Sequence, residues 1–193
     1  YVFDIGPGAG VHGGEITEGA IDESIRHAIT KLAHWHFAAA ETYANRIRQM
    51  GEATERVWNV GAPALDNISA LEPVPKQELE SFLGLQLSAP AFLATYHPVT
   101  LRGDSGLSAI QALLSALDTF GGTVVITGVN ADPGAGVIRK SLLDFAAARP
   151  NRVALLESLG SRRYLSLMLH VDAVVGNSSS GLIEAPAIGV PTV

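Results

Sequence analysis

The densest polar pattern in this sequence is a run of serines between two glycines, Gly176 to Gly181 (GNSSSG), with Glu184 shortly after it. The apolar residues before the run (DAVV) predict a strand, and the residues from Leu182 onward predict a helix. Backbone N–H groups at a helix start attract anions. The three hydroxyls of Ser178 to Ser180 therefore predict a diphosphate site, and Glu184 predicts an acceptor for ribose hydroxyls. The same serines are also typical helix caps, and this alternative stays open.

A second chemical cluster lies in residues 12–23 (HGGEITEGAIDE), which contain one imidazole, that of His12, and four carboxylates, among them Glu15 and Asp22. The glycines between them let the backbone approach a ligand closely, and imidazole and carboxylate groups are suited to proton transfer. Asp22 also falls in the first turn of a predicted helix, where it improves the helix-dipole electrostatics and can pair with Arg26. Both a structural and a catalytic role are therefore open for Asp22.

Two more polar residues follow predicted strands. His97 comes directly after the strand predicted for 92–96, and Pro98 keeps its backbone extended. Asn130 follows the strand predicted for 123–127. Because ligands bind outside the carboxyl ends of the strands in open α/β sheets, we expect His97, Asn130 and Ser178 to converge at one edge. There the imidazole could donate to a phosphate or act as an acid.

The elements that position these residues alternate between helix and strand. In the first part of the chain, helices are predicted at 22–32 and 41–50 and strands at 36–39 and 57–60. In the second part, strands are predicted at 92–96, 123–127, 153–156 and 173–175, and helices at 105–120, 135–148, 162–170 and 182–188. This alternation predicts an α/β fold with parallel sheets. The proline-containing stretch 61–75 is the candidate linker between the two parts.

Bulk composition excludes several classes of protein. The 193 residues are enough for one large or two small domains, and a net charge of -6 argues against broad nucleic-acid binding. The absence of cysteine excludes disulfides, thiolate nucleophiles and cysteine metal sites. The chain has no apolar stretch of the roughly 18 residues that a membrane helix needs, and it lacks a basic signal-peptide start. We expect a soluble, cytoplasmic protein without membrane or nucleic-acid partners.

Two other patterns do not predict a cofactor or a metal. Residues 8–13 match GxGxxG, but the residues after them are a poor helix opening, and a dinucleotide fingerprint requires a helix there. NAD is therefore not expected. His34 and His36 share one face of a predicted strand, but a third ligand at suitable spacing is missing, so packing is expected for both.

Five blocks of the sequence, taken in order, resemble the UDP-N-acetylglucosamine 2-epimerase family, particularly its hydrolysing, sialic-acid-pathway branch. The blocks are HGGEITEGAIDESIRHAITKLAHWHF, VWNVGAPALDNI, TYHPVT, ITGVNADPGAG and GNSSSGLIEAPAIGVPTV. The resemblance implies two Rossmann-like domains of the GT-B type. Residues 1–64 would belong to an N-terminal domain that is only partly present, and residues 65–193 would form the C-terminal, UDP-binding domain.

The resemblance also implies roles for single residues. The residues that it assigns to the nucleotide are His97, Asn130, Ser178, Ser179 and Glu184. The residues that it assigns to catalysis are His12, Glu15, Asp22, Arg26 and His97, the last as a group that assists the leaving diphosphate.

The reaction implied by the resemblance is loss of the C2 proton with anti-elimination of UDP, through 2-acetamidoglucal, followed by addition of water to give N-acetylmannosamine. Donors around the departing diphosphate favour such a step, and carboxylates facing the sugar would act as base and acid. No metal or redox cofactor is required, and a homo-oligomer, a dimer or tetramer, is expected. A non-hydrolysing epimerase giving UDP-ManNAc, a GT-B glycosyltransferase and a non-catalytic UDP-sugar-binding module are the alternatives. Relatives have further segments before His12 and after Val193, so we expect this chain to be part of a larger protein.

Overall fold

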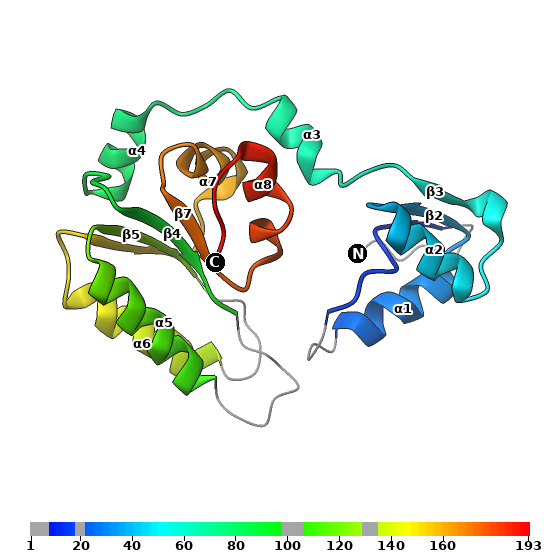
Figure 1. Cartoon of the computed structure of the whole chain (residues 1–193), viewed down its shortest axis with the longest axis horizontal. Coiled ribbons are helices and arrows are strands. Elements are labelled where there is room, and N and C mark those ends of the chain that lie inside the picture. Colours follow the sequence, from blue (N-terminus) through cyan, green and yellow to red (C-terminus); the bar gives the residue numbers. More distant parts are fainter. Residues whose placement is uncertain (1–7, 18–21, 98–105, 129–134) are drawn as a thin grey trace. The chain divides into compact units, whose positions relative to one another are not determined.

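The computed structural model describes residues 8–17, 22–97, 106–128 and 135–193. The chain divides into two compact units, which we call unit 1 (residues 1–66) and unit 2 (residues 67–193) (Figure 1). Each unit contains one parallel sheet and has its own hydrophobic core. The prediction of an α/β fold with parallel sheets is confirmed.

Unit 1 is built on a sheet with the strand order β1-β2-β3. Its elements are β1 (Ala9–Val11), α1 (Asp22–Leu32), β2 (Trp35–Ala38), α2 (Glu41–Gln49), the 3₁₀ helix η1 (Thr54–Arg56), β3 (Val57–Asn59) and the start of α3 (Ala64–Ser69). Side chains alternate between the two faces of a strand, so His36 and Ala38 share one face with Val57, the register partner of His36. On this face Ala38 and Val57 pack against Ala44 and Ile47 of α2.

The opposite face of the unit 1 sheet carries large apolar side chains that stay exposed. Val11 is 57% exposed, Trp35 39% and Trp58 41%. Phe37 stacks on Trp58 with the ring centroids 5.3 Å apart. Both tryptophans of the chain therefore lie on this one face.

Unit 2 contains a sheet with the strand order β6-β5-β4-β7. Its elements, after the end of α3, are α4 (Lys76–Leu83), β4 (Ala91–Thr95), α5 (Leu107–Phe120), β5 (Thr123–Thr127), α6 (Ala135–Ala147), β6 (Val153–Leu156), α7 (Gly160–Met168), β7 (Ala173–Gly176), the 3₁₀ helix η2 (Ser179–Gly181) and α8 (Glu184–Ile188). The helices α5 and α6 lie on one face of the sheet, and α7 and α8 lie on the other (Figure 1).

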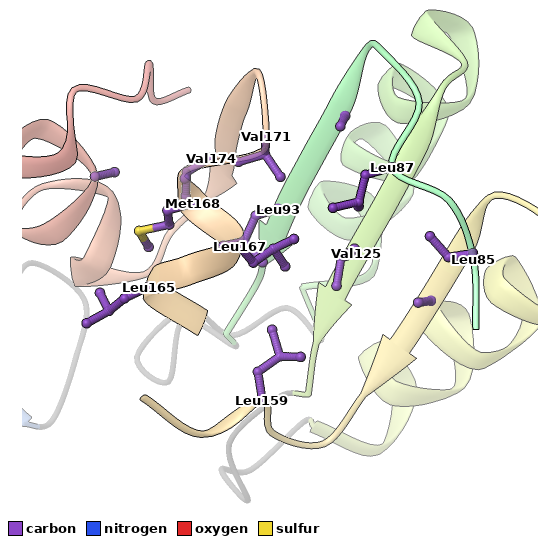
Figure 2. Close-up of a cluster of buried hydrophobic side chains, with 13 residues drawn as sticks. Leu85, Leu87, Leu93, Val125, Leu159, Leu165, Leu167, Met168, Val171 and Val174 are labelled. Atoms are coloured by element: carbon purple, nitrogen blue, oxygen red, sulfur yellow. The ribbon is translucent and has the colours of Figure 1, made fainter. Parts of the chain in front are cut away.

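Both faces of the unit 2 sheet are buried. On one face, Leu93 and Val125 pack with Leu165, Leu167 and Met168 of α7 (Figure 2). On the other face, a second cluster joins the sheet to α5 and α6 through Ala94, Ile110, Leu114, Leu117, Val124, Ile126, Ile138, Leu142, Phe145 and Val153. Strands that are buried on both faces read as continuous apolar runs, which is why the sequence shows them so clearly.

The strand order places a topological switch point between β4 and β7. From β4 the chain moves outward to β5 and β6, and it then crosses back through α7 to β7 on the other side of β4. The connection after β4 leads to α5 on one face of the sheet, whereas the connection after β7 leads to α8 on the other (Figure 1). Ligands of open α/β sheets bind in the crevice at the carboxyl ends of strands that diverge in this way.

The structure also corrects parts of the sequence interpretation. The predicted strands 123–127 and 153–156 match β5 and β6, but the patterns do not predict β1 or α4. Helix α3 lies within the candidate linker 61–75, and so does the boundary between the two units. The helix predicted from Leu182 begins at Glu184 instead, because the serines first form η2. Among the described residues, no helix combines the length and apolar character needed to cross a membrane.

Candidate functional site

The strongest candidate site lies at the switch point between β4 and β7. Directly after β4, the backbone N–H of His97 donates to Oδ1 of Asn177 at 2.7 Å, and Nδ2 of Asn177 donates to the carbonyl oxygen of His97 at 2.8 Å. The backbone N–H of Asn177 donates to the carbonyl oxygen of Thr95 at 3.2 Å. These bonds hold the segments after β4 and β7 side by side, as the convergence of His97 with the serine run predicts.

Beneath this pair of hydrogen bonds, the two backbones approach so closely that only glycine fits. Gly176 has a φ of +130°, and a Cβ atom added to it would lie 1.8 Å from the carbonyl oxygen of Thr95. The buried hydroxyl of Thr95 is hydrogen-bonded to that of Thr127 on β5. The loops that follow β4 and β7 therefore start from a closely packed edge of the sheet.

The serine run forms a turn that uses several of its own donors. The Ser178 hydroxyl caps η2 by accepting a hydrogen bond from the backbone N–H of Ser180 at 3.3 Å. The N–H groups of Gly181 and Leu182 donate to carbonyl oxygens within the turn at 3.1 and 2.9 Å. The prediction of a helix start at Leu182 is therefore wrong, and Ser178 does act as a cap. Ser179 is exposed, so its hydroxyl is accessible to a ligand.

Glu184 is the first residue of α8. Its Oε2 atom and the Ser180 hydroxyl are buried and have no hydrogen-bond partner among the described residues. Buried polar groups in native structures are nearly always hydrogen-bonded. These two atoms therefore mark a place where a hydrogen bond from a ligand or from solvent is expected.

In unit 1, three of the residues predicted to be catalytic contact one another around the loop that follows β1. Oε1 of Glu15 lies 3.0 Å from Nδ1 of His12, and Oε2 of Glu15 accepts a hydrogen bond from the N–H of Gly13 at 2.8 Å. Nε of Arg26 lies 3.6 Å from the same Oε2 atom. His12 has a φ of +67°, which is uncommon for a residue with a Cβ atom. Glu15 is thus the centre of this cluster.

Helix α1 anchors the same loop. Arg26 donates to the Thr17 hydroxyl at 3.1 Å and to the carbonyl oxygen of Glu15 at 3.3 Å. The carboxylate of Glu23 accepts a hydrogen bond from the backbone N–H of Thr17 at 2.9 Å. Asp22 is the exposed first residue of α1, and within the described part of the chain Arg26 forms its ion pair with Glu15 and not with Asp22. Asp22 is therefore accessible for a role outside this network.

A buried titratable side chain, that of His36, lies elsewhere in unit 1. His36 is only 2% exposed, its Nε2 lies 3.3 Å from Oε2 of Glu52, and Lys31 is hydrogen-bonded to Oε1 of Glu52. Burial lowers the pKa of His36, although the nearby carboxylate of Glu52 acts to raise it. Burial alone would raise the pKa of Glu52, but the hydrogen bond and charge of Lys31 bring it below its usual value. The expectation that His36 serves packing is confirmed.

The described residues contain no group of three or more histidine, cysteine, aspartate and glutamate side chains that could hold a metal ion. The structure brings His12, Glu15 and Arg26 together in unit 1 and places His97 next to the serine run in unit 2, whereas Asp22 lies outside the first group. Asn130 lies outside the described residues. Asn177 is missed by the sequence interpretation, although a side-chain amide directly after a strand end offers both a donor and an acceptor.

Comparison with solved structures identifies the class of fold. A crystal structure of UDP-GlcNAc 2-epimerase from Neisseria meningitidis bound to UDP-GlcNAc has a TM-score of 0.77 and 21% sequence identity, over 97% of this chain and 52% of that chain. A structure of UDP-GlcNAc 2-epimerase from Methanocaldococcus jannaschii in complex with UDP-GlcNAc and UDP has a TM-score of 0.71 and 17% identity, over 94% of this chain and 51% of that chain. These likenesses establish an α/β fold of the GT-B type.

Sequence comparison then defines the family. Residues 7–193 match the family model of UDP-N-acetylglucosamine 2-epimerase, and the chain belongs to this family. A Campylobacter jejuni protein named GDP/UDP-N,N'-diacetylbacillosamine 2-epimerase (hydrolyzing) is 40% identical over 182 residues, which are 94% of this chain and 47% of that protein. The polysialic acid biosynthesis protein P7 of Escherichia coli is 37% identical over 185 residues, covering 95% of this chain and 46% of that protein. The chain thus spans about half the length of these curated relatives.

Proposed function

We propose that this chain is part of a hydrolysing UDP-N-acetylglucosamine 2-epimerase, which converts UDP-GlcNAc to N-acetylmannosamine and UDP. The observation that carries the proposal is the 40% identity, over nearly the whole chain, to a relative named as a hydrolyzing 2-epimerase. The geometry of each unit supports it. In unit 2, the carboxyl ends of β4 and β7 form the kind of sheet edge at which nucleotides bind. Unit 1 contains imidazole and carboxylate groups suited to proton transfer.

Residues 65–193 form the UDP-binding domain in this proposal. The diphosphate lies against the exposed hydroxyl of Ser179 and the imidazole of His97, a residue whose backbone Asn177 holds at the sheet edge. Ser178 and Asn130 complete this part of the site. The carboxylate of Glu184, which has an unpartnered oxygen, accepts a hydrogen bond from the ribose. Donors fixed around the departing diphosphate stabilise the charge that develops on it.

Residues 1–64 belong to the domain that carries the proton-transfer groups. His12, Glu15 and Arg26 form one hydrogen-bonded and ion-paired cluster, and Asp22 lies exposed at the start of α1. Loss of the C2 proton supplies the electron pair of the new C1–C2 double bond, while the C1–O bond breaks and UDP leaves with its electrons. Water then adds to the double bond, with hydroxyl at C1 and a proton at C2 on the opposite face. Two groups on opposite faces of the sugar are suited to these two transfers.

The direct test uses the complete protein that contains this chain. It is incubated with UDP-GlcNAc in D₂O, and the products are followed by ³¹P and ¹H NMR. We expect UDP and N-acetylmannosamine in equal amounts, with solvent deuterium at C2. UDP-ManNAc as the product identifies a non-hydrolysing epimerase, and UDP binding without turnover identifies a binding module.

A matched pair of aspartates tests the catalytic role of unit 1. Asp22 and Asp66 are both exposed acidic residues in the first turn of a helix, α1 and α3 respectively. We expect Asp22→Asn to lower kcat by at least about 100-fold, as loss of a general acid or base does, with UDP affinity unchanged. Asp66→Asn is expected to leave both unchanged. Equal activity of the two variants contradicts a catalytic role for Asp22.

Three serine variants separate ligand contact from helix capping: Ser179 tests contact with the ligand, and Ser178 is compared with Ser158. The hydroxyls of Ser178 and Ser158 both follow strand ends and both accept a hydrogen bond from the N–H two residues further on. Isothermal titration with UDP is expected to show roughly tenfold or greater weakening for Ser179→Ala, since hydrogen bonds to charged groups contribute about 1.5–3 kcal/mol. Ser158→Ala is expected to leave the affinity unchanged. If Ser178→Ala behaves like Ser158→Ala, Ser178 is a cap alone.

A second candidate substrate is UDP-N,N'-diacetylbacillosamine. It is favoured by the names of two relatives, from Campylobacter jejuni and from Legionella pneumophila, the latter 32% identical over 183 residues. A Neisseria meningitidis relative that is 31% identical is named UDP-N-acetylglucosamine 2-epimerase. The ratio of kcat/KM for the two UDP-sugars decides between them.

The assembly and compartment belong to the same proposal. We place the protein in the cytoplasm, since a chain without cysteine is compatible with a reducing compartment. A homodimer or homotetramer is the state that the family resemblance implies. Light scattering of the complete protein after size-exclusion chromatography measures it.

A further inference from the structure

We propose that Glu15 is a positioning residue, which holds the His12 imidazole in the tautomer protonated at Nδ1, and that Nε2 of His12 is the atom that takes the proton from the sugar. The chemical step in this inference rests on the proposed function. The tautomer does not, because it follows from the contacts around Glu15.

The contacts of Glu15 define the protonated nitrogen of His12. A carboxylate only accepts hydrogen bonds, so the 3.0 Å contact between Oε1 of Glu15 and Nδ1 of His12 requires a hydrogen on Nδ1. In the neutral ring, Nε2 then carries the free lone pair. Such a pairing, in which a carboxylate orients the base through its other ring nitrogen, is the arrangement that fixes a catalytic histidine in serine hydrolases.

The other oxygen of Glu15 is occupied as well. Oε2 accepts the N–H of Gly13 at 2.8 Å, and Nε of Arg26 lies 3.6 Å from it. The Glu15 side chain is 17% exposed, whereas the His12 side chain is 43% exposed. Within this pair, the imidazole is the group that a substrate can reach, and the carboxylate is the group that supports it.

The backbone constrains His12 further. Its φ of +67° is disfavoured for residues with a Cβ atom, and its N–H donates to the carbonyl oxygen of Phe37 at the end of β2 at 3.0 Å. A Cβ atom on the nearby Gly14 would lie 2.2 Å from the carbonyl oxygen of Tyr43. An unusual backbone conformation that several contacts maintain is a typical property of functional sites.

In this step, transfer of the C2 proton to His12 is coupled to the departure of UDP. Nε2 accepts the proton from C2, the C–H electron pair forms the C1–C2 double bond, and UDP leaves with the electrons of the C1–O bond. The imidazolium that results lies against the Glu15 carboxylate, which stabilises its positive charge. Glu15 itself neither gains nor loses a proton in this step.

The tautomer is tested by NMR on the complete protein labelled with ¹⁵N-histidine, at a pH where the ring is neutral. Long-range ¹H–¹⁵N correlations distinguish the two tautomers, and the spectrum of His12→Gln assigns the His12 signals. We expect Nδ1–H for His12 in the wild type and a shift toward Nε2–H in Glu15→Ala. Glu23→Gln is the matched control, because Glu23 also ties this loop to the protein, through Thr17, but does not contact the ring. An Nε2–H wild type, or an equal shift in Glu23→Gln, overturns the positioning role.

Kinetics with UDP-GlcNAc then test the step. We expect Glu15→Ala to lower kcat by about 100-fold or more with little change in KM, and Glu15→Asp to restore part of kcat. A tautomer shift without a loss of kcat overturns the assignment of Nε2 as the proton acceptor. If the wild type shows the expected tautomer but no turnover, the proposed function fails and the sugar step fails with it, while the positioning of His12 by Glu15 stands.

Discussion

The sheets of the two units differ in how their faces are buried. In unit 2, apolar clusters cover both faces of the sheet, and the loops after β4 and β7 start from this packed base. In unit 1, α2 packs on one face, whereas Val11, Trp35 and Trp58 on the other face are exposed. The same kind of parallel sheet therefore supports its candidate site in two physically different ways.

The difference shows what holds each group of polar residues in place. The His97 backbone is fixed by hydrogen bonds at the end of strands that are themselves buried on both sides. The loop around His12 depends on polar ties, through Glu15, Glu23 and Arg26, to a helix at its side. The candidate site of unit 2 can be formed in advance by packing, while the loop around His12 depends on a few charged contacts.

The largest expected effects come from the two faces of the unit 2 sheet. Leu93 belongs to the cluster on one face and Ile126 to the cluster on the other. We expect Leu93→Ala and Ile126→Ala each to lower the free energy of unfolding of unit 2 by about 3–5 kcal/mol, because each leaves a cavity in a filled core. Urea unfolding followed by far-UV circular dichroism measures this. Fluorescence of Trp35 and Trp58 reports unit 1 alone and is expected to keep its midpoint; a shift shows that the units unfold together.

The next effect sharpens the link between packing and the site. Gly176→Ala is expected to cost about 3 kcal/mol, because the methyl group combines strain at positive φ with a clash against Thr95. Gly189→Ala is the control, since Gly189 has a φ of +89° but an added Cβ would meet no atom within 4 Å. It is expected to cost about 1–2 kcal/mol. UDP affinity is expected to fall only in Gly176→Ala, and equal affinities contradict the importance of this edge.

These properties were predictable from the sequence to different degrees. The strands of unit 2 are predictable because burial on both faces gives continuous apolar runs such as residues 123–127. Strand β1 is not predictable, because it is short (AGV) and the glycines around it indicate a turn. The meeting of His97 with the serine run follows from strand ends alone. The role of Asn177 in holding the two segments together is not predictable, because a side-chain hydrogen bond to a backbone far along the chain leaves no local sequence pattern.

The serine run shows a further limit of sequence patterns. Hydroxyls next to a predicted helix are consistent with both capping and anion binding. The structure shows that Ser178 caps η2 and that amides of the turn are already used. Which donors remain depends on whether the first turn is 3₁₀ or α-helical. The serine pattern does not distinguish the two, because 3₁₀ turns are also frequent at the N-termini of α-helices.

A smaller effect tests the asymmetry of the unit 1 sheet directly. Val57 and Val11 are valines on strands of the same sheet, 3% and 57% exposed. We expect Val57→Ala to lower the free energy of unfolding of unit 1 by about 2 kcal/mol and Val11→Ala to change it by less than about 0.5 kcal/mol. Urea unfolding followed by tryptophan fluorescence measures both. Equal losses in the complete protein contradict the asymmetry and show that other residues cover this face there.

The smallest expected effect concerns pH and unit 1 alone. Burial lowers the pKa of His36, so below the ordinary histidine pKa of about 6.5 the unfolded chain binds more protons at this position than the folded unit does. Neutral His36 therefore makes its full contribution to the free energy of unfolding above about pH 6.5. This contribution is lost as the pH falls toward the pKa of His36 in the folded state. Glu52, whose pKa is also lowered, contributes only nearer its own ordinary value of 4.5. We expect the urea midpoint of tryptophan fluorescence to be lower at pH 5.5 than at pH 7.5.

A histidine pair identifies the source of this pH dependence. His36→Gln keeps a donor that can reach Glu52 but removes the titrating ring, so the difference between the two midpoints is expected to shrink. His27→Gln removes a ring that is 32% exposed and paired with Glu23 on the same helix, and there the difference is expected to persist. If His36→Gln retains the full pH dependence, the acid sensitivity of unit 1 does not come from its buried histidine.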